Sequence, residues 1–307
     1  MSGKILLLGL ILSLLLVTAC VLGAEDSPDF PTYKEGEVTL PSDITVLPQF
    51  SFDGNYGLVA SADTLYHLEL RHGRIHGKTG LSGQILAFSP ASNGYIYLIT
   101  ETKLVSIEGF SVINSVELPS NAITLTVCAS DPVVALETGS ILLFNGSDLA
   151  LINTFDSPSE EIVFIEGFSN FLIAAFSDST LRSYSIPNFD EVVSEKYNGT
   201  FLFLRAVNSD RLIFSTDFWN EVAVCSPLDL KITEMFTFPE TPTIASADSD
   251  LSCIYAVCPS QGLQVCLANG EIAWRTEEFG LNPLVTVSPD CEAALVVTNR
   301  VVSLLLR

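Results

Sequence analysis

The chain has 307 residues, of which 36 are Asp or Glu and only 14 are Lys or Arg, so its formal net charge at pH 7 is −22. Nucleic acids and anionic lipid surfaces bind proteins through clustered Lys and Arg. The composition therefore excludes nucleic acid as a partner and favours proteins, basic ones above all, and cations.

The first 24 residues have the pattern of a secretory signal. A basic Lys4 precedes an uncharged run from residue 5 to residue 23. This pattern predicts a signal peptide over 1–24 and a linker over 25–36, in a protein that is secreted or held in the secretory-pathway lumen. The run is also long enough to remain as a membrane anchor, which would hold the protein at the extracytoplasmic face. A third interpretation is a lipoprotein, because the four residues that end at Cys20 resemble a permissive bacterial lipobox.

The rest of the chain is built from repeats. Within each repeat, four short runs rich in β-branched and aromatic residues are separated by turn-forming residues. Four strands in a unit of this length are typical of a propeller blade. The pattern predicts an all-β fold, a seven-bladed β-propeller of four-stranded antiparallel blades over 37–307. The repeats are marked by an Asp or Asn, usually after Ser, every 38 to 40 residues: Asp53, Asn93, Asp131, Asn170, Asp210, Asp250 and Asp290.

The last unit resembles known propeller repeats. Its sequence VSPDCEAALVVTNRVVSLLL, which begins at Val287, is similar to the YVTN and WD40-like repeats, in which a Ser-Pro-Asp turn precedes a buried strand. No Trp-Asp or Gly-His pair marks the blades, so the resemblance is to the architecture. Residues 267–274, LANGEIAW, resemble a quinoprotein-type repeat, but this motif occurs once. A quinone cofactor is therefore not expected.

The seventh unit is too short to hold a fourth strand, because the chain ends at Arg307. Residues 38–43, VTLPSD, match residues 116–121, VELPSN, which lead from one predicted blade into the next. We therefore expect the N-terminal segment to pair beside residues 301–306 as the outer strand of the last blade. This pairing would close the ring and cover an open sheet edge.

All three histidines lie in residues 66–78, YHLELRHGRIHGK. A two-residue turn at His72–Gly73 predicts an amphipathic outer hairpin, in which His67 and His76 share the solvent face because side chains alternate across a sheet. Exchanging both histidines for Gln is then expected to leave folding unchanged. A metal site and an anion-binding or partner-binding patch are the alternative interpretations.

Six cysteines follow the signal segment, and four of them lie between residues 253 and 291. Any disulfide is therefore expected in that region. Cys128 and Cys225 are interpreted as small buried hydrophobic residues. Two sequons, at Asn145 and Asn198, are candidate glycosylation sites that would suit a eukaryotic secretory route.

No catalytic motif is found in the sequence. It has no G-x-S-x-G elbow, no H-E-x-x-H and no Gly-rich phosphate loop, and its histidines are confined to one hairpin. The acidic turns would suit calcium, but no loop has the EF-hand spacing, so no cofactor is expected. No catalytic, cofactor-binding or metal-ligating residue is assigned.

Carboxylates gather instead at the predicted connections between blades and in one unusual loop. Two bulky aromatic residues between carboxylates would anchor a partner, although packing between blades is an equal alternative for the Trp. The candidate partner-binding residues are Asp217, Phe218, Trp219, Glu221, Glu240, Glu277 and Glu278.

The predicted function is a monomeric, non-catalytic protein-binding scaffold outside the cytosol. One alternative is a carboxylate- or metal-dependent propeller enzyme, lactonase-like or lyase-like, with its site at the mouth of the central channel. A second alternative is a lipoprotein scaffold anchored through Cys20, which would resemble the outer-membrane assembly propellers that have quinoprotein-type repeats.

Overall fold

The computed structural model describes residues 33–69, 74–157, 161–280 and 282–306. The predicted signal peptide, Cys20 and the His72–Gly73 turn lie outside these residues. Within the described part of the chain, no helix has the length and apolar character needed to cross a bilayer.

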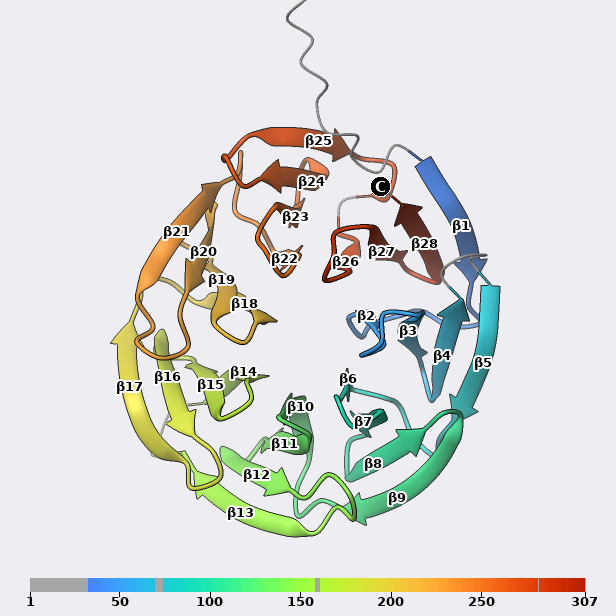
Figure 1. The fold of residues 1–307 in the computed structure, drawn as a ribbon, viewed down its shortest axis with the longest axis vertical. Helices are drawn as coiled ribbons and strands as arrows, with labels where there is room; N and C mark the ends of the chain where they lie inside the picture. Colours follow the sequence, from blue (N-terminus) through green and yellow to red (C-terminus); the bar gives the residue numbers. More distant parts are fainter. Residues whose placement is uncertain (1–32, 70–73, 158–160, 281, 307) are drawn as a thin grey trace, which may run out of the picture.

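Seven four-stranded antiparallel sheets stand in a ring around a central channel (Figure 1), so the predicted seven-bladed propeller is confirmed. The four strands of each blade follow one another from the channel outward to the rim. The innermost strands are β2 (Gln49–Phe50), β6 (Ala87–Pro90), β10 (Ala122–Cys128), β14 (Ile162–Gly167), β18 (Phe201–Asn208), β22 (Ile244–Ala247) and β26 (Leu284–Val287). The second strands are β3 (Tyr56–Ser61), β7 (Tyr95–Ile99), β11 (Asp131–Leu136), β15 (Phe171–Phe176), β19 (Arg211–Thr216), β23 (Cys253–Cys258) and β27 (Ala293–Thr298).

The third and fourth strands complete the blades toward the rim. The third strands are β4 (Thr64–Glu69), β8 (Lys103–Glu108), β12 (Ser140–Phe144), β16 (Thr180–Ser185), β20 (Glu221–Cys225), β24 (Gly262–Leu267) and β28 (Val301–Leu306). The outer strands are β5 (Arg74–Gly80), β9 (Ser111–Glu117), β13 (Leu151–Asp156), β17 (Asp190–Lys196), β21 (Ile232–Thr237), β25 (Ile272–Thr276) and, for the seventh blade, β1 (Tyr33–Thr39).

The second strands form the core because both of their faces are covered by neighbouring blades. The strand β15 shows this: its sequence FLIAAF is buried at every position after the first. Such a continuous apolar run is what a strand covered on both faces requires. Adjacent blades therefore pack through apolar clusters, such as the one that joins β11 to β15.

The recurring Asp and Asn residues lie in or next to the turns between first and second strands, as predicted. The carboxylate of Asp53 accepts hydrogen bonds from Ser51 Oγ (2.6 Å) and from the backbone N–H of Asn55 (3.2 Å). Asp290 repeats the arrangement with Ser288 Oγ (2.6 Å) and the backbone N–H of Glu292 (3.1 Å). These side chains stabilise their own turns.

Exchanging Asp53 or Asp290 for Asn is expected to change the free energy of unfolding at pH 7 by less than about 0.5 kcal/mol. The amide oxygen of Asn can accept the same backbone hydrogen bond, and both side chains are exposed. Urea denaturation of the two variants measures the effect. A loss of more than about 2 kcal/mol in either variant would show that the carboxylate does more than stabilise a turn.

The predicted ring closure is confirmed. The strand β1 pairs antiparallel with β28, from Tyr33 opposite Leu306 to Thr39 opposite Val301, and the two strands lie side by side in Figure 1. Beyond β1, the N–H of Leu40 donates to the carbonyl of Arg300 (2.7 Å). The strand begins before residue 37, so residues 33–36 belong to the propeller and not to the linker predicted over 25–36.

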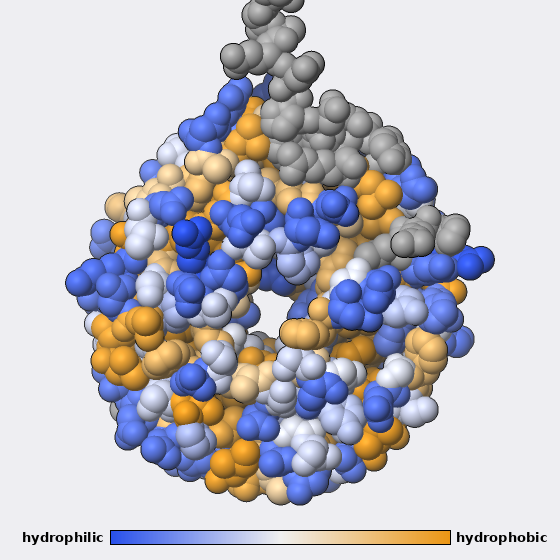
Figure 2. All heavy atoms as spheres, in the orientation of Figure 1, coloured by the Kyte–Doolittle hydropathy of each residue, from blue (hydrophilic) through white to orange (hydrophobic). Residues whose placement is uncertain are grey.

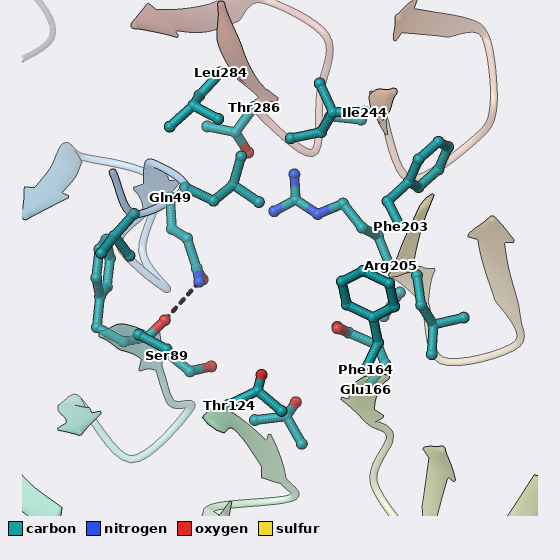
Figure 3. A pocket seen from close by; sticks show the side chains of 18 of the residues that line it. Gln49, Ser89, Thr124, Phe164, Glu166, Phe203, Arg205, Ile244, Leu284 and Thr286 are labelled. Carbon is teal, nitrogen blue, oxygen red and sulfur yellow. Dashed lines mark hydrogen bonds between the residues drawn. The ribbon is translucent and has the colours of Figure 1, made fainter. Parts of the chain in front are cut away.

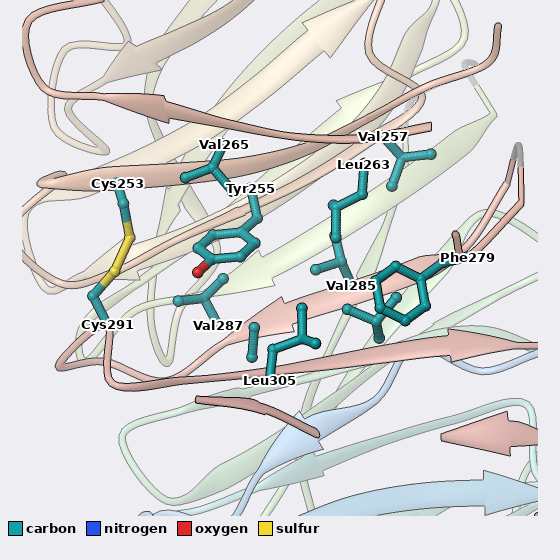
Figure 4. Packing of buried hydrophobic residues seen from close by; sticks show 12 residues of the cluster. Cys253, Tyr255, Val257, Leu263, Val265, Phe279, Val285, Val287, Cys291 and Leu305 are labelled. Carbon is teal, nitrogen blue, oxygen red and sulfur yellow. A yellow bond between two sulfur atoms is a disulfide. The ribbon is translucent and has the colours of Figure 1, made fainter. Parts of the chain in front are cut away.

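A disulfide joins Cys253 in the sixth blade to Cys291 in the seventh, inside the predicted region. Figure 4 shows the bond beside Tyr255 and Val287, which belong to the apolar cluster between these two blades. Cys128 and Cys225 are free and buried, as predicted. Burial raises the pKa of the Cys128 thiol to about 12, so this residue behaves as a hydrophobic side chain.

The histidine hairpin differs from the prediction. In the register of β4 and β5, His67 lies opposite Gly77 and Leu68 opposite Ile75, so His76 forms a bulge. His76 is exposed, but His67 is only 6% exposed. The expectation that both histidines face solvent is therefore wrong for His67. Exchanging both histidines for Gln is then no longer expected to leave folding unchanged, because one of the two side chains is buried.

The burial of His67 has a cause in the neighbouring blade. The ring of Phe110, from the turn between β8 and β9, lies edge-on to His67 with 4.8 Å between ring centroids. Gly77 leaves the space for that ring, since a Cβ at this position would lie 2.2 Å from Phe110 Cε1. Packing between blades thus covers a side chain that an isolated hairpin would expose.

Candidate functional site

The two faces of the ring carry different loops. Because the strands alternate in direction, the connections between blades and the turns between second and third strands open on one face, called here the connection face. The first-to-second and third-to-fourth turns open on the other, called the turn face. All the candidate partner-binding residues lie on the connection face, in or beside loops of the fifth to seventh blades: Asp217, Phe218, Trp219, Glu221, Glu240, Glu277 and Glu278.

The two aromatic residues of the fifth-blade loop have different surroundings. Phe218 is 71% exposed. Trp219 is half-buried and packs against Tyr197 (5.9 Å between ring centroids) and Phe214 (5.8 Å). Trp219 thus stabilises the boundary between the fourth and fifth blades, whereas Phe218 is free to contact another molecule.

Two of the predicted carboxylates support neighbouring loops. Asp217 Oδ1 accepts a hydrogen bond from the backbone N–H of Thr200 (2.7 Å). Both oxygens of Glu240 accept hydrogen bonds from Ser260, one from its N–H and one from its Oγ, each at 2.6 Å. These two side chains hold adjacent connection-face loops together.

Glu277 and Glu278 are exposed, and Glu221 is half-buried at the start of β20. Among the described residues, the only three potential metal ligands that converge are Asp248, Cys253 and Cys291. The two sulfur atoms of that group are bonded to each other.

The central channel holds a site that the sequence analysis missed. It has a volume of about 610 Å³ and is lined by the innermost strands of all seven blades. Figure 2 shows its opening in the middle of the ring. In every blade, one polar residue of the innermost strand pairs with the third residue of the second strand. Because these seven polar residues hold equivalent positions, they form a ring at one level of the channel. We call this set the polar ring: Gln49, Ser89, Thr126, Glu166, Arg205, Ser246 and Thr286.

A second ring lies two residues earlier in each innermost segment, nearer the connection face. Residues two apart in a strand share a face, so these side chains line the same channel. All but Thr124 are apolar, and we call this set the apolar ring: Leu47, Ala87, Thr124, Phe164, Phe203, Ile244 and Leu284. The channel wall is thus amphipathic along its axis.

Several members of the polar ring tie blades together. Gln49 Nε2 donates to the carbonyl of Phe88 (2.6 Å). Thr126 Oγ1 accepts from the N–H of Gly167 (2.8 Å), and Ser246 Oγ accepts from the N–H of Val287 (3.1 Å). Because the innermost strands of different blades do not share a sheet, these bonds are direct polar links between them.

Glu166 and Arg205 are the only charged residues among the described lining of the channel. They occupy equivalent positions of adjacent blades, and both are half-buried. Figure 3 shows Arg205 extending into the channel, with Glu166 on the neighbouring strand. Arg205 Nη1 makes a long hydrogen bond of 3.4 Å to the carbonyl of Val285 across the channel.

The channel environment changes the acidity of both groups. Burial raises the pKa of Glu166 to about 7, against the lowering effects of the Arg205 charge and of a hydrogen bond from Ala206. Burial also lowers the pKa of Arg205, while Glu166 raises it. The sequence did hold a signal for these residues: each polar-ring residue lies four or five positions before the recurring Asp or Asn.

The two sequons lie on different faces. Asn198 is exposed in the connection between β17 and β18. Asn145 is half-buried in the turn between β12 and β13, and its Oδ1 accepts hydrogen bonds from Ser147 N–H (2.9 Å) and Oγ (2.6 Å). Of the two, Asn198 is the more accessible to a glycosyltransferase.

Neither the protein-family models nor the curated protein sequences contain a match to this chain. Solved structures do match. The β-propeller domain of Cps50 (Swd1) from Myceliophteria thermophila has a TM-score of 0.76 and 13% identity, covering 88% of this chain and 98% of that one. The WD40 domain of Neurospora crassa Pan2 has a TM-score of 0.75 and 11% identity, covering 89% and 94%. A chain of the mitotic checkpoint complex has a TM-score of 0.77 and 10% identity, covering 91% and 93%. At these identities the similarity shows the fold, which is that of a WD40-like seven-bladed β-propeller.

Proposed function

We propose that this protein is a non-catalytic scaffold that binds a basic protein partner outside the cytosol. The observation that carries the proposal is Phe218, which is 71% exposed at the connection face. Asp217 and Glu221 lie beside it, and Glu277 and Glu278 are exposed on the same face. An uncovered aromatic side chain among carboxylates has the composition of an interface anchor with an acidic rim.

Two further observations support an interaction role. The net charge of −22 favours association with a basic surface through long-range attraction. One similar propeller was solved within the mitotic checkpoint complex. Both agree with a rigid ring that presents loops to another protein.

The test uses partners crosslinked to the full chain in its native compartment and identified by mass spectrometry. Each is then titrated with wild-type protein, with Phe218→Ser and with Leu228→Ser. Leu228 is the matched control, because it is 57% exposed in the same blade but on the turn face. We expect at least one partner to lose about tenfold or more in affinity with Phe218→Ser and to keep its affinity with Leu228→Ser. If no captured partner behaves in this way, the proposed surface is wrong.

The compartment is tested separately at the N-terminus. The proposal of a secreted or lumenal protein expects a mature chain that begins near Glu25, with an N-glycan at Asn198. Intact mass before and after glycan removal measures both features. A lipidated Cys20 would instead support the anchored lipoprotein, and an intact first segment would support the membrane anchor.

A further inference from the structure

The central channel presents one carboxylate and one guanidinium to the same enclosed space. Glu166 and Arg205 stand at equivalent positions of adjacent innermost strands, and no third charge is found in the described lining. The volume of about 610 Å³ lies in the range of small-molecule sites, which is roughly 300–1,000 Å³. A ligand that satisfied both groups would carry one positive and one negative charge.

The apolar ring adds a second requirement. Phe164 and Phe203 lie two residues before Glu166 and Arg205 on the same strands, and Ile244 and Leu284 continue the ring (Figure 3). A ligand held by both charged groups would therefore direct any side chain onto an apolar and aromatic wall. This arrangement separates the charged end of the ligand from its hydrophobic end.

We propose that the channel binds a small zwitterion with an apolar side chain, of the free α-amino acid class. The ammonium group of the ligand contacts Glu166, and its carboxylate contacts the guanidinium of Arg205. Its side chain lies against Phe164 and its neighbours in the apolar ring. The site is independent of the proposed protein-binding surface, which lies on the loops of the connection face.

The state of the two groups agrees with this assignment. Burial raises the pKa of Glu166 to about 7 and lowers the pKa of Arg205, because the channel solvates each charge poorly. Arg205 has a single long hydrogen bond, although a guanidinium carries five N–H donors. Bidentate binding of a ligand carboxylate would use donors that the described contacts leave available.

Calorimetric titration with three matched compounds tests the proposal. The probes are L-phenylalanine, phenethylamine, which lacks the carboxylate, and 3-phenylpropionate, which lacks the ammonium. We expect the full mature protein to bind L-phenylalanine with a dissociation constant that is lower than either of the others by about tenfold or more, because each charged hydrogen-bonded contact contributes separately.

Two variants assign the contacts. Arg205→Met should remove the preference for L-phenylalanine over phenethylamine, and Glu166→Gln should remove the preference over 3-phenylpropionate. The controls make the same substitutions at exposed rim positions, Arg275→Met and Glu195→Gln, and should bind as wild type.

Three results would overturn the proposal. The first is no binding of L-phenylalanine up to about 10 mM, because the contacts with Glu166 and Arg205 would then contribute too little free energy to hold a ligand. The second is equal binding of the three probes. The third is that the channel variants keep the wild-type preferences. Should a channel variant fail to fold, the comparison of the three probes on the wild-type protein still decides. The scaffold proposal is judged by Phe218→Ser, so the two proposals can fail separately.

Discussion

Deleting residues 25–39 is expected to cost the mature protein at least about 3 kcal/mol of stability, or about 10 °C in its melting temperature, or to make it aggregate. The deletion removes β1, which forms six residue pairs with β28. It also removes Val38, which packs on the cluster that contains Val302 and Leu304. The freed edge of β28 would present unpaired backbone groups beside aliphatic side chains, which promotes strand association between molecules.

Deleting residues 25–32 is the matched control, because these residues precede β1. This shorter deletion should melt within about 2 °C of the full mature chain. A synthetic peptide of residues 33–44, added in excess to the longer deletion, should restore part of the lost stability, because a segment that binds only the folded ring stabilises it by mass action. Identical melting of the two deletions, measured by circular dichroism and light scattering, would contradict the role of β1 in closing the ring.

The blades and their closure could be predicted because their signals are local in the sequence. An Asp or Asn marks each turn, and Asp53, Asn93 and Asp290 accept hydrogen bonds from the backbone of their own turns. Each second strand is a continuous apolar run, so these signals do not depend on distant contacts. The match between residues 38–43 and 116–121 revealed β1, since both segments lead from an outer strand into the next blade. Only the start of β1 was missed, because Tyr33–Gly36 is not apolar enough to mark a strand.

The features that escaped prediction are not encoded by a local pattern of the sequence. The bulge at His76 shifts the pairing of β4 and β5 by one residue, and no alternation of polar and apolar residues encodes it. The polar ring was hidden for a different reason. Glu166 and Arg205 interrupt apolar runs of the innermost strands, and only the ring geometry shows that such positions face a channel and not the core.

Because His67 is buried, we expect the folded protein to lose stability at acid pH. Burial lowers the pKa of His67 to about 4 from an ordinary value of 6.5, with repulsion from His76 as a second cause. Below pH 6.5 the unfolded chain binds a proton at this residue that the folded chain does not bind. The His67 contribution to stability is therefore constant above pH 6.5 and is lost progressively as the pH falls toward 4, by about 3 kcal/mol in all.

Exchanging His67 for Leu should remove this loss. Leu is of similar size, and it eliminates the buried Nε2 atom that has no hydrogen-bond partner. Relative to wild type, the variant should gain about 3 kcal/mol between pH 7.5 and pH 4. Carboxylates that titrate over the same range, Glu166 among them, are common to both proteins and cancel in the difference.

Urea denaturation at pH 7.5, 6 and 4 measures the difference. His76→Gln is the control, because His76 is exposed and its removal leaves the burial of His67 by Phe110 in place. This control should retain most of the acid sensitivity of the wild type. Parallel pH profiles for wild type and His67→Leu would mean that His67 gains a proton in the folded state as easily as in the unfolded one. The ring of Phe110 would then not exclude water from the imidazole, and the blade boundary would be open at this point.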